Sequence, residues 1–144
     1  MTILRNILAV VIGLVIGGLV NMSLVVIGPH VIPTPAGVNM TNTQSLTASI
    51  HLLKPQHFVF PFLAHALGTL VGALVAFLIA ASYRSVLSYV IGALTLVGGI
   101  AASILIPAPI WFKVLDLAVA YIPMAWLGIL IGRHIIKGSS VVSP

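Results

Sequence analysis

The sequence predicts an all-α fold: an integral membrane antiparallel bundle of four transmembrane helices, with a short amphipathic helix in the outer 29–57 loop. Three observations predict it. Hydrophobic residues make up 60% of the 144 residues and charged residues only 5%, whereas about a quarter of the residues of a soluble domain are charged. Four segments are apolar over the roughly 20 residues that cross a bilayer. Only one connection between these segments is long enough to hold a further element.

The four spans are expected to form a single domain over residues 1–144. We place them at about residues 7–28, 58–82, 86–106 and 110–136, with a tail at 137–144. The first apolar run is longer than the core of a signal peptide and no small-residue cleavage site follows it, so we expect a retained span. Pro107 and Pro109 predict a tight hairpin before the last span, because each lacks an amide donor and disfavours helix at the preceding residue.

Residues 43–53 of the outer loop are expected to form the short amphipathic helix. The stretch from Thr41 to Gln44 resembles a capping box, apolar residues then recur at helical spacing, and Pro55 ends the pattern. We expect this helix to lie on the outer face of the bilayer or to cap the bundle. The loop then serves either as a cover or as a lid that controls the access of a ligand.

The distribution of Lys and Arg predicts the orientation in the membrane. One side of the predicted bundle holds Arg5, Arg84, Arg133 and Lys137, and the other holds Lys54 and Lys113. Cytoplasmic segments carry the excess of positive charge. We therefore expect a multi-pass protein of a cell membrane with both termini in the cytoplasm.

The composition also excludes several classes of protein. The chain has no cysteine, so disulfides, thiolate metal sites and the thiol chemistry of small membrane oxidoreductases are excluded. The basic residues are spread singly rather than clustered, so no nucleic-acid partner is expected. His51, His57 and His65 follow no metal-site spacing, and His134 lies at the opposite membrane edge from His65. We therefore expect no metal, no haem and no other cofactor.

Four polar side chains are predicted to lie in one layer of the outer leaflet. At a rise of about 1.5 Å per residue, they lie roughly 6 to 10 Å below the outer ends of their spans. They are Asn21, His65, Ser103 and Asp116. Each shares a helical face with small residues, which let helices pack closely in lipid. We therefore expect these side chains to point into the bundle.

Two interpretations of this layer stay open. Its members bond to one another and lock the bundle, or they form a binding or proton-handling site open to the outer side, because an imidazole beside a carboxylate can exchange a proton near neutral pH. The candidate ligand-binding or proton-relay residues are Asn21, His65, Thr69, Ser103, Lys113 and Asp116. Lys113 lies one turn from Asp116 and is expected to neutralise it, although its long stem can also reach the interface.

A hydrolase is a weaker alternative. Ser103, His65 and Asp116 have the composition of a catalytic triad. No nucleophile elbow and no oxyanion-hole signature accompany them. We therefore expect no catalytic residue and no enzyme.

Three Gly-x-x-x-Gly pairs mark places of close helix packing. They are Gly13/Gly17, Gly68/Gly72 and Gly128/Gly132. The pattern does not state whether this packing occurs within one chain or between chains. The doubled glycines Gly17-Gly18 and Gly98-Gly99 touch two helix faces each, so a homo-oligomer or a larger membrane complex is compatible with the sequence.

Three stretches of the sequence carry a resemblance: PTPAG at 33–37, FPFLAHALGT at 60–69 and WFKVLDL at 111–117. They resemble a family of small bacterial four-span membrane proteins of uncharacterised activity. The resemblance covers most of the chain and implies a bacterial cytoplasmic (inner) membrane, but no activity and no site residues. Small multidrug exporters fit poorly, since they carry an essential acid in the first span where this chain has Asn21. Fluoride channels fit poorly because they insert in both orientations, whereas the Lys and Arg distribution of this chain favours one.

Together these observations favour a non-enzymatic membrane protein that acts by binding, as an accessory subunit or as a binder of a small ligand in the outer leaflet. The alternative is a small transporter or channel that uses Asp116 and His65 as a proton or cation relay. The lipid bilayer is the partner that the composition requires.

Overall fold

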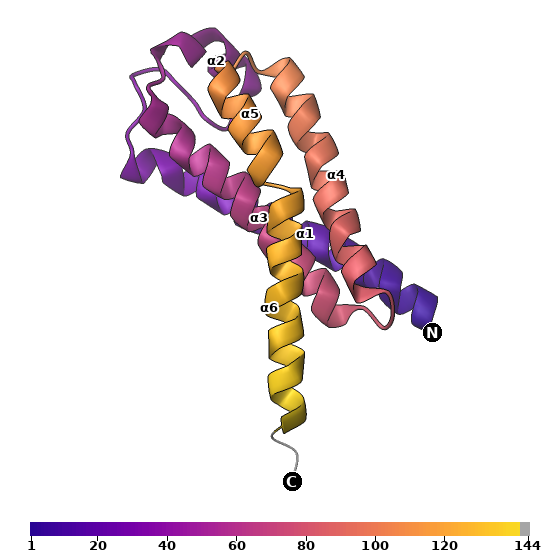
Figure 1. The fold of residues 1–144 in the computed structure, drawn as a ribbon. Coiled ribbons are helices and arrows are strands. Elements are labelled where there is room, and N and C mark those ends of the chain that lie inside the picture. The colour runs from indigo at the N-terminus through magenta and orange to yellow at the C-terminus, as the bar shows by residue number, and fades with distance from the viewer. Residues whose placement is uncertain (142–144) are drawn as a thin grey trace.

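The computed structural model describes residues 1–141, and its regular elements there are helical (Figure 1). They are α1 (Thr2–Val31), α2 (Thr43–Ser49), η1 (Ile50–Leu52), η2 (Pro55–Phe58), α3 (Val59–Ile79), α4 (Arg84–Leu105), α5 (Ile110–Val119) and α6 (Ile122–Val141), where η denotes a 3₁₀ turn. Four helical segments of the described part are long and apolar enough to cross a membrane, which confirms the predicted four-span bundle. Of the predicted tail, 137–141 belongs to α6 and 142–144 lies outside the described residues.

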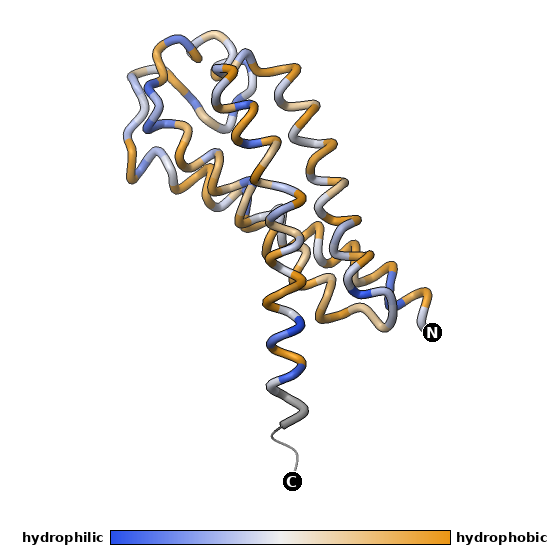
Figure 2. Tube along the Cα trace, viewed as in Figure 1, coloured by the Kyte–Doolittle hydropathy of each residue, from blue (hydrophilic) through white to orange (hydrophobic). Residues whose placement is uncertain are grey.

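The spans run antiparallel, and α1 begins at the end of the bundle opposite the loop between α1 and α3 (Figure 1). α1 and α3 run side by side, while α6 crosses α3 and ends away from the other helices. Figure 2 shows that hydrophilic residues gather in the loop between α1 and α3, called the outer loop after its predicted side of the membrane, and near the C-terminal end of the coloured part of α6, whereas the spans are mostly hydrophobic. This is the arrangement expected of helices that cross a bilayer and place their polar residues at its two edges.

α3 is the central helix, because it packs against α1, α4 and α6. One buried cluster consists of Ala73, Ala76, Ile91 and Ala125, and a second of Ala66, Ala120 and Tyr121. Most of these residues are alanines, which let neighbouring helices approach closely. Such packing stabilises membrane helices because lipid supplies little hydrophobic driving force between them.

α1 and α3 cross through two interlocking Gly-x-x-x-Gly pairs. A Cβ atom on Gly17 would lie 2.5 Å from the carbonyl oxygen of Gly68, and one on Gly13 would lie 2.7 Å from that of Gly72. The reverse contacts are also tight, at 2.9 Å from Gly68 to the carbonyl of Gly17 and 2.7 Å from Gly72 to that of Gly13. Because the opposing atoms belong to the backbone, they cannot rotate away, and the crossing requires glycine on both helices.

The third pair, Gly128 and Gly132 on α6, faces α3. A Cβ atom on Gly128 would lie 2.9 Å from the carbonyl oxygen of Leu70, and one on Gly132 would collide with the ring of Phe77. All three glycine pairs of the sequence therefore pack helices within one chain.

The first turn of α1 is fastened to the end of α3 and the turn that follows it. Arg5 Nε donates to the carbonyl oxygen of Ile79 over 2.6 Å. The side chain of Asn6 donates to Ser82 Oγ over 2.9 Å and accepts from the amide of Ala81 over 3.0 Å. The last carbonyl groups of a helix have no partner inside it, so the Arg5 side chain satisfies one of them.

α1 continues past its predicted end at residue 28. Pro29 lies inside the last turn of the helix and removes one amide donor, yet Ile32 N still donates to the carbonyl oxygen of Gly28 over 2.8 Å. Ile32 has an extended backbone, with φ −119° and ψ 92°, which is the conformation that a residue before proline prefers. The following Pro33, rather than Pro29, therefore ends the helix.

The fourth span, which we expected as one helix over 110–136, is interrupted. Two helices, α5 and α6, take its place, and Ala120 and Tyr121 form the connection between them. Pro123 accounts for the interruption, since it has no amide to donate to the carbonyl of Val119 and its ring crowds the preceding turn. The break turns Tyr121 into the bundle, where it is 2% exposed.

The outer loop contains the predicted short helix. α2 and η1 together cover 43–52, close to the expected 43–53. The cap differs from the expected capping box, because Asn42 rather than Thr41 is the N-cap. Its side-chain oxygen accepts from the amide of Ser45 over 2.9 Å, as asparagine at this position commonly does.

Candidate functional site

Asp116 on α5 is the only acidic residue of the chain, and it is bonded to His65 on α3. The side chain of Asp116 is 6% exposed and that of His65 is 28% exposed. Nδ1 of His65 lies 2.9 Å from both carboxyl oxygens. The contact is an ion pair when the imidazole is protonated. The structure therefore brings together the two predicted residues best suited to hold a proton.

Tyr121 completes a polar cluster with His65 and Asp116. Its hydroxyl donates to Asp116 Oδ2 over 2.9 Å, and the ring centroids of Tyr121 and His65 lie 5.8 Å apart. Residues five apart do not face each other on a regular helix, so the bond to Asp116 depends on the break between α5 and α6. Sequence reasoning missed Tyr121 for this reason, although Pro123 was a signal for the break.

Gly99 on α4 provides the space for the Tyr121 ring. A Cβ atom on Gly99 would collide with the hydroxyl and the ring of Tyr121, whereas one on the adjacent Gly98 would meet nothing within 4 Å. A small residue on α4 thus positions one of the donors of the polar cluster.

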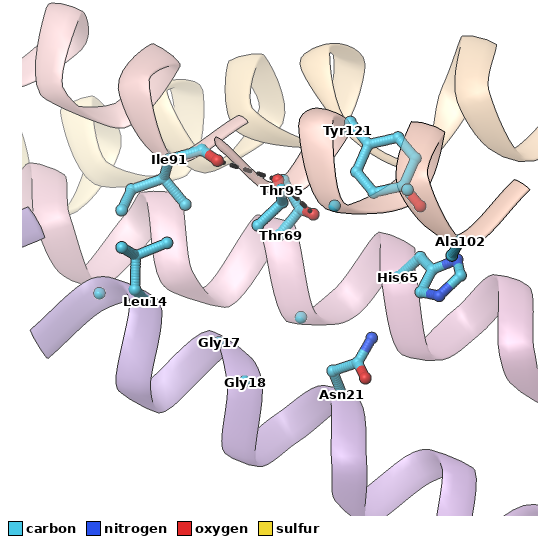
Figure 3. A pocket seen from close by; sticks show the side chains of 14 residues that line it. Leu14, Gly17, Gly18, Asn21, His65, Thr69, Ile91, Thr95, Ala102 and Tyr121 are labelled. Carbon is cyan, nitrogen blue, oxygen red and sulfur yellow. Dashed lines mark hydrogen bonds between the residues drawn. The ribbon is translucent and has the colours of Figure 1, made fainter. Parts of the chain in front are cut away.

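A groove of about 250 Å³ lies beside the polar cluster, between α1, α3 and α4 (Figure 3). Its polar residues are Asn21, His65, Thr69, Thr95 and Tyr121, and the rest of its lining is glycine, alanine, leucine and isoleucine. Gly18 of α1 and Gly98 of α4 line the groove and are exposed. The groove, called the α1–α4 groove below, is therefore open between these two helices, on the side that faces lipid in a membrane.

Asn21 reaches this groove from α1 and faces His65 across it (Figure 3). The side-chain amide of Asn21 bonds to no other described residue, and the bonds of His65 use Nδ1 and leave Nε2 without a partner there. Every fully buried side-chain nitrogen and oxygen of the described residues has a partner. Asn21 and His65 therefore present unused hydrogen-bonding groups to the groove from opposite walls.

Thr69 joins helices rather than adding a free group to the groove. Its Oγ1 donates to Thr95 Oγ1 over 3.2 Å, and Thr95 Oγ1 donates to the carbonyl oxygen of Ile91 over 2.9 Å (Figure 3). Thr69 is 2% exposed. The pair links α3 to α4 within the wall of the groove.

Ser103 and Lys113 lie apart from the polar cluster, contrary to the predicted layer. Ser103 Oγ donates to the carbonyl oxygen of Ile100 in its own helix over 2.7 Å, which a helical serine does readily because that carbonyl lies within reach. Lys113 Nζ donates to the carbonyl oxygen of Ser103 over 2.6 Å. Lys113 thus links α5 to α4 and does not pair with Asp116, whose carboxyl group is bonded to His65 and Tyr121.

A second cavity, of about 150 Å³, lies beneath the outer loop and is called the loop cavity below. Met40 and Leu46 of the loop line it together with Phe60 of α3. His65 and Ala102 line both cavities. The imidazole of His65 therefore lies between the loop cavity and the α1–α4 groove.

His57 fastens the outer loop. Its Nδ1 accepts from the amide of Lys54 over 2.8 Å, and its Nε2 lies 3.2 Å from the carbonyl oxygen of Pro33. Because Nδ1 accepts, Nε2 carries the proton and donates to Pro33. Sequence reasoning assigned His57 no role, since a bond across a loop leaves no spacing pattern.

Among the described residues, no group of three or more His, Cys, Asp or Glu side chains lies close enough together to hold a metal ion. No protein family model, no curated protein and no solved structure matches this chain. The chemistry of the site is therefore inferred from its own geometry.

Proposed function

We propose that this protein binds an amphipathic small molecule or lipid in the outer leaflet, without catalysis, alone or as an accessory subunit of a membrane complex. One observation carries the proposal: Asn21 and Nε2 of His65 face an open groove of about 250 Å³ without a protein partner. Polar groups inside a membrane are costly unless they are bonded. The head of a bound ligand would satisfy both groups.

The lining of the α1–α4 groove supports an amphipathic ligand. Asn21 and His65 supply its free polar groups, and the remaining lining is dominated by glycine and apolar residues. Ligand sites commonly combine apolar walls with a few well-placed polar groups, in cavities of about 300–1,000 Å³. The groove is slightly smaller, so we expect the ligand tail to continue between Gly18 and Gly98 into the lipid.

Blocking the groove tests this function. Gly18→Leu and Gly98→Leu add a side chain where a Cβ atom meets nothing within 4 Å, so both variants should fold. Ala93→Leu, at another exposed position of α4, is the matched control. Mass spectrometry of gently purified protein should detect a bound amphipathic compound with the parent and with the control, and lose it with both glycine variants. The same retention in all four proteins, or no bound compound with the parent, would contradict the function.

A proton or cation relay through His65 and Asp116 is the second candidate function. It is favoured by the position of His65, which lines both cavities while it is bonded to Asp116. An imidazole placed between two cavities can take up a proton on one side and release it on the other. Liposomes that contain the parent protein and an internal pH-sensitive dye should then dissipate a proton gradient, and Asp116→Asn should abolish this flux. No flux from the parent under a range of proton and cation gradients would exclude a relay.

The membrane and the orientation are also part of the proposal: a bacterial inner membrane, with both termini in the cytoplasm. The excess of Lys and Arg at the predicted inner edge supports this orientation. Because the chain has no cysteine, single cysteines can report it. A membrane-impermeant thiol reagent added to intact cells should label Thr47→Cys in the outer loop and leave Gly138→Cys of α6 unlabelled. The reverse labelling would contradict the orientation.

An assembly with further copies or with other membrane proteins would use exposed helix faces. α1 offers the largest such face, since only 11% of the residues in its most hydrophobic stretch are buried within the chain. Chemical cross-linking in native membranes, followed by mass spectrometry, should capture such an assembly through α1. Cross-links confined to single chains would indicate a monomer.

A further inference from the structure

The chemical class of the ligand head follows from the charges and protons around the groove. We propose that the head is an uncharged hydrogen-bond acceptor, such as the carbonyl of a ketone, quinone or ester, rather than a carboxylate, phosphate or ammonium group. This inference rests on the proposed binding function and specifies its ligand.

The α1–α4 groove offers no counter-ion to a charged head. Among the described residues that line it, none is Lys, Arg, Asp or Glu. Outside the groove, Lys113 is bonded to the carbonyl of Ser103, and His57 uses both ring nitrogens within the outer loop. Within the polar cluster, the carboxyl group already has His65 as its partner. A charged head would therefore bring an uncompensated charge into the membrane, which is costly.

The positions of the protons in the polar cluster determine which hydrogen bonds an uncharged head can make. A carboxylate beside a neutral imidazole protonated only on Nδ1 would leave a net negative charge inside the membrane, which is costly, so we expect the pair of Asp116 and His65 to be electrically neutral. It can be neutral in two ways: an imidazolium beside a carboxylate, or a neutral imidazole whose Nδ1 accepts from a carboxylic acid. In both forms one proton lies between Nδ1 and the carboxyl group, which are 2.9 Å apart. In both forms Nε2 also carries a proton. In a neutral pair, Nε2 of His65 is therefore a donor toward the groove, whether the shared proton is on Nδ1 or on the carboxyl group.

Asn21 supplies a second donor from the opposite wall. Figure 3 shows its amide nitrogen turned toward His65. The hydroxyl of Tyr121 does not compete, because it already donates to Asp116. A carbonyl oxygen has two lone pairs and can accept from both donors. An uncharged carbonyl head thus matches both walls of the groove.

Three probes with the same dodecyl-length chain test this class of ligand. The protein in phosphatidylcholine nanodiscs is titrated with 2-dodecanone that carries carbon-13 at its carbonyl. We expect a saturable second carbonyl signal, downfield of the ketone dissolved in lipid, because hydrogen bonds to the oxygen deshield the carbon. Empty nanodiscs should not give it. Unlabelled dodecanoate and dodecyltrimethylammonium should displace the bound ketone at least about tenfold less effectively than unlabelled 2-dodecanone, since their charges stay unpaired.

Variants locate the bound ketone. Gly98→Leu should remove the second signal, and Ala93→Leu should retain it. Asn21→Leu should weaken binding and move the signal toward that of the free ketone, because one donor is lost. Asn21 is a better target than His65, whose replacement would leave the carboxyl group of Asp116 without its partner.

The outcomes separate the inference from the function on which it rests. Displacement by dodecanoate or dodecyltrimethylammonium at the concentrations that suffice for 2-dodecanone would overturn the uncharged head and leave the binding function standing. A second signal that persists in Gly98→Leu would place the ketone outside the groove and would also overturn the inference. Absence of Gly98-dependent binding for all three probes, with no compound retained from the membrane, would overturn the binding function itself.

Discussion

The α1–α3 crossing and the α1–α4 groove use glycine for opposite purposes. At the crossing, Gly17 lies against the backbone of Gly68 with no room for a methyl group, while the adjacent Gly18 faces open space. The same division occurs on α4, where Gly99 touches Tyr121 and Gly98 meets nothing. In each Gly-Gly pair, one glycine therefore packs against a neighbouring helix, and the other lies at the opening of the groove. Small residues in a span mark a close approach only where a neighbouring helix lies against them.

Disrupting the α1–α3 crossing should have the largest effect on stability. The methyl group of Gly17→Ala would lie 2.5 Å from the carbonyl oxygen of Gly68, so α1 and α3 must separate. We expect a loss of about 1–3 kcal/mol in the free energy of unfolding, the range typical of overpacked cores. Gly18→Ala is the control and should leave stability nearly unchanged. Unfolding in mixed detergent micelles, followed by circular dichroism, measures both variants, and equal losses would contradict the division between crossing and groove.

The same comparison on α4 should give a smaller effect, because a side chain can move where a backbone cannot. Gly99→Ala displaces the Tyr121 ring and Tyr121→Phe removes its hydroxyl, so each breaks the bond to Asp116. Hydrogen bonds between membrane helices average about 0.6 kcal/mol, and we expect a loss near that value for Tyr121→Phe. Both changes should shift the carboxyl carbon resonance of Asp116 in the same direction. Gly98→Ala should not shift it, and a shift as large as that of Gly99→Ala would contradict the assigned role of Gly99.

The smallest effect on overall stability is expected in the outer loop. His57→Ala removes the bonds to Lys54 and Pro33, so amide hydrogen exchange within 34–54 should become about tenfold faster, as expected for the loss of roughly 1–1.5 kcal/mol of local stability. Amides of α3 and α6 should keep their rates. His51→Ala, at an exposed histidine of the same loop, is the control. Equal acceleration in both variants would show that His57 does not fasten the loop.

The spans and the short loop helix could be predicted because they depend on local composition. Runs of apolar residues fix where a helix can cross the bilayer, and a rise of about 1.5 Å per residue fixes the depth of each polar group. Depth and helical face together sufficed to predict that His65 and Asp116 point into the bundle. They did not suffice for Ser103, because a serine hydroxyl can bond to its own helix whichever neighbour it faces.

Other features depend on competition between residues or on distant contacts. Both Pro29 and Pro33 could have ended α1, and the choice depends on how the last turn tolerates one missing donor. Tyr121 joined the polar cluster only because Pro123 breaks the fourth span. The bonds of Asn6 connect residues more than seventy positions apart. Such contacts leave no periodic pattern in the sequence.

The bond between His65 and Asp116 inside the bilayer is tested most directly by solid-state NMR of the protein in lipid. Because the chain has a single acidic residue, carbon-13 labelling of aspartate gives one side-chain carboxyl signal that needs no further assignment. With nitrogen-15 in the histidine rings, this carbon should couple strongly to one imidazole nitrogen, as expected for Nδ1 at 2.9 Å from both carboxyl oxygens. The coupling should vanish in His65→Gln. A carboxyl carbon with no imidazole nitrogen nearby, or a coupling that persists in His65→Gln, would show that α3 and α5 do not bring these two groups together.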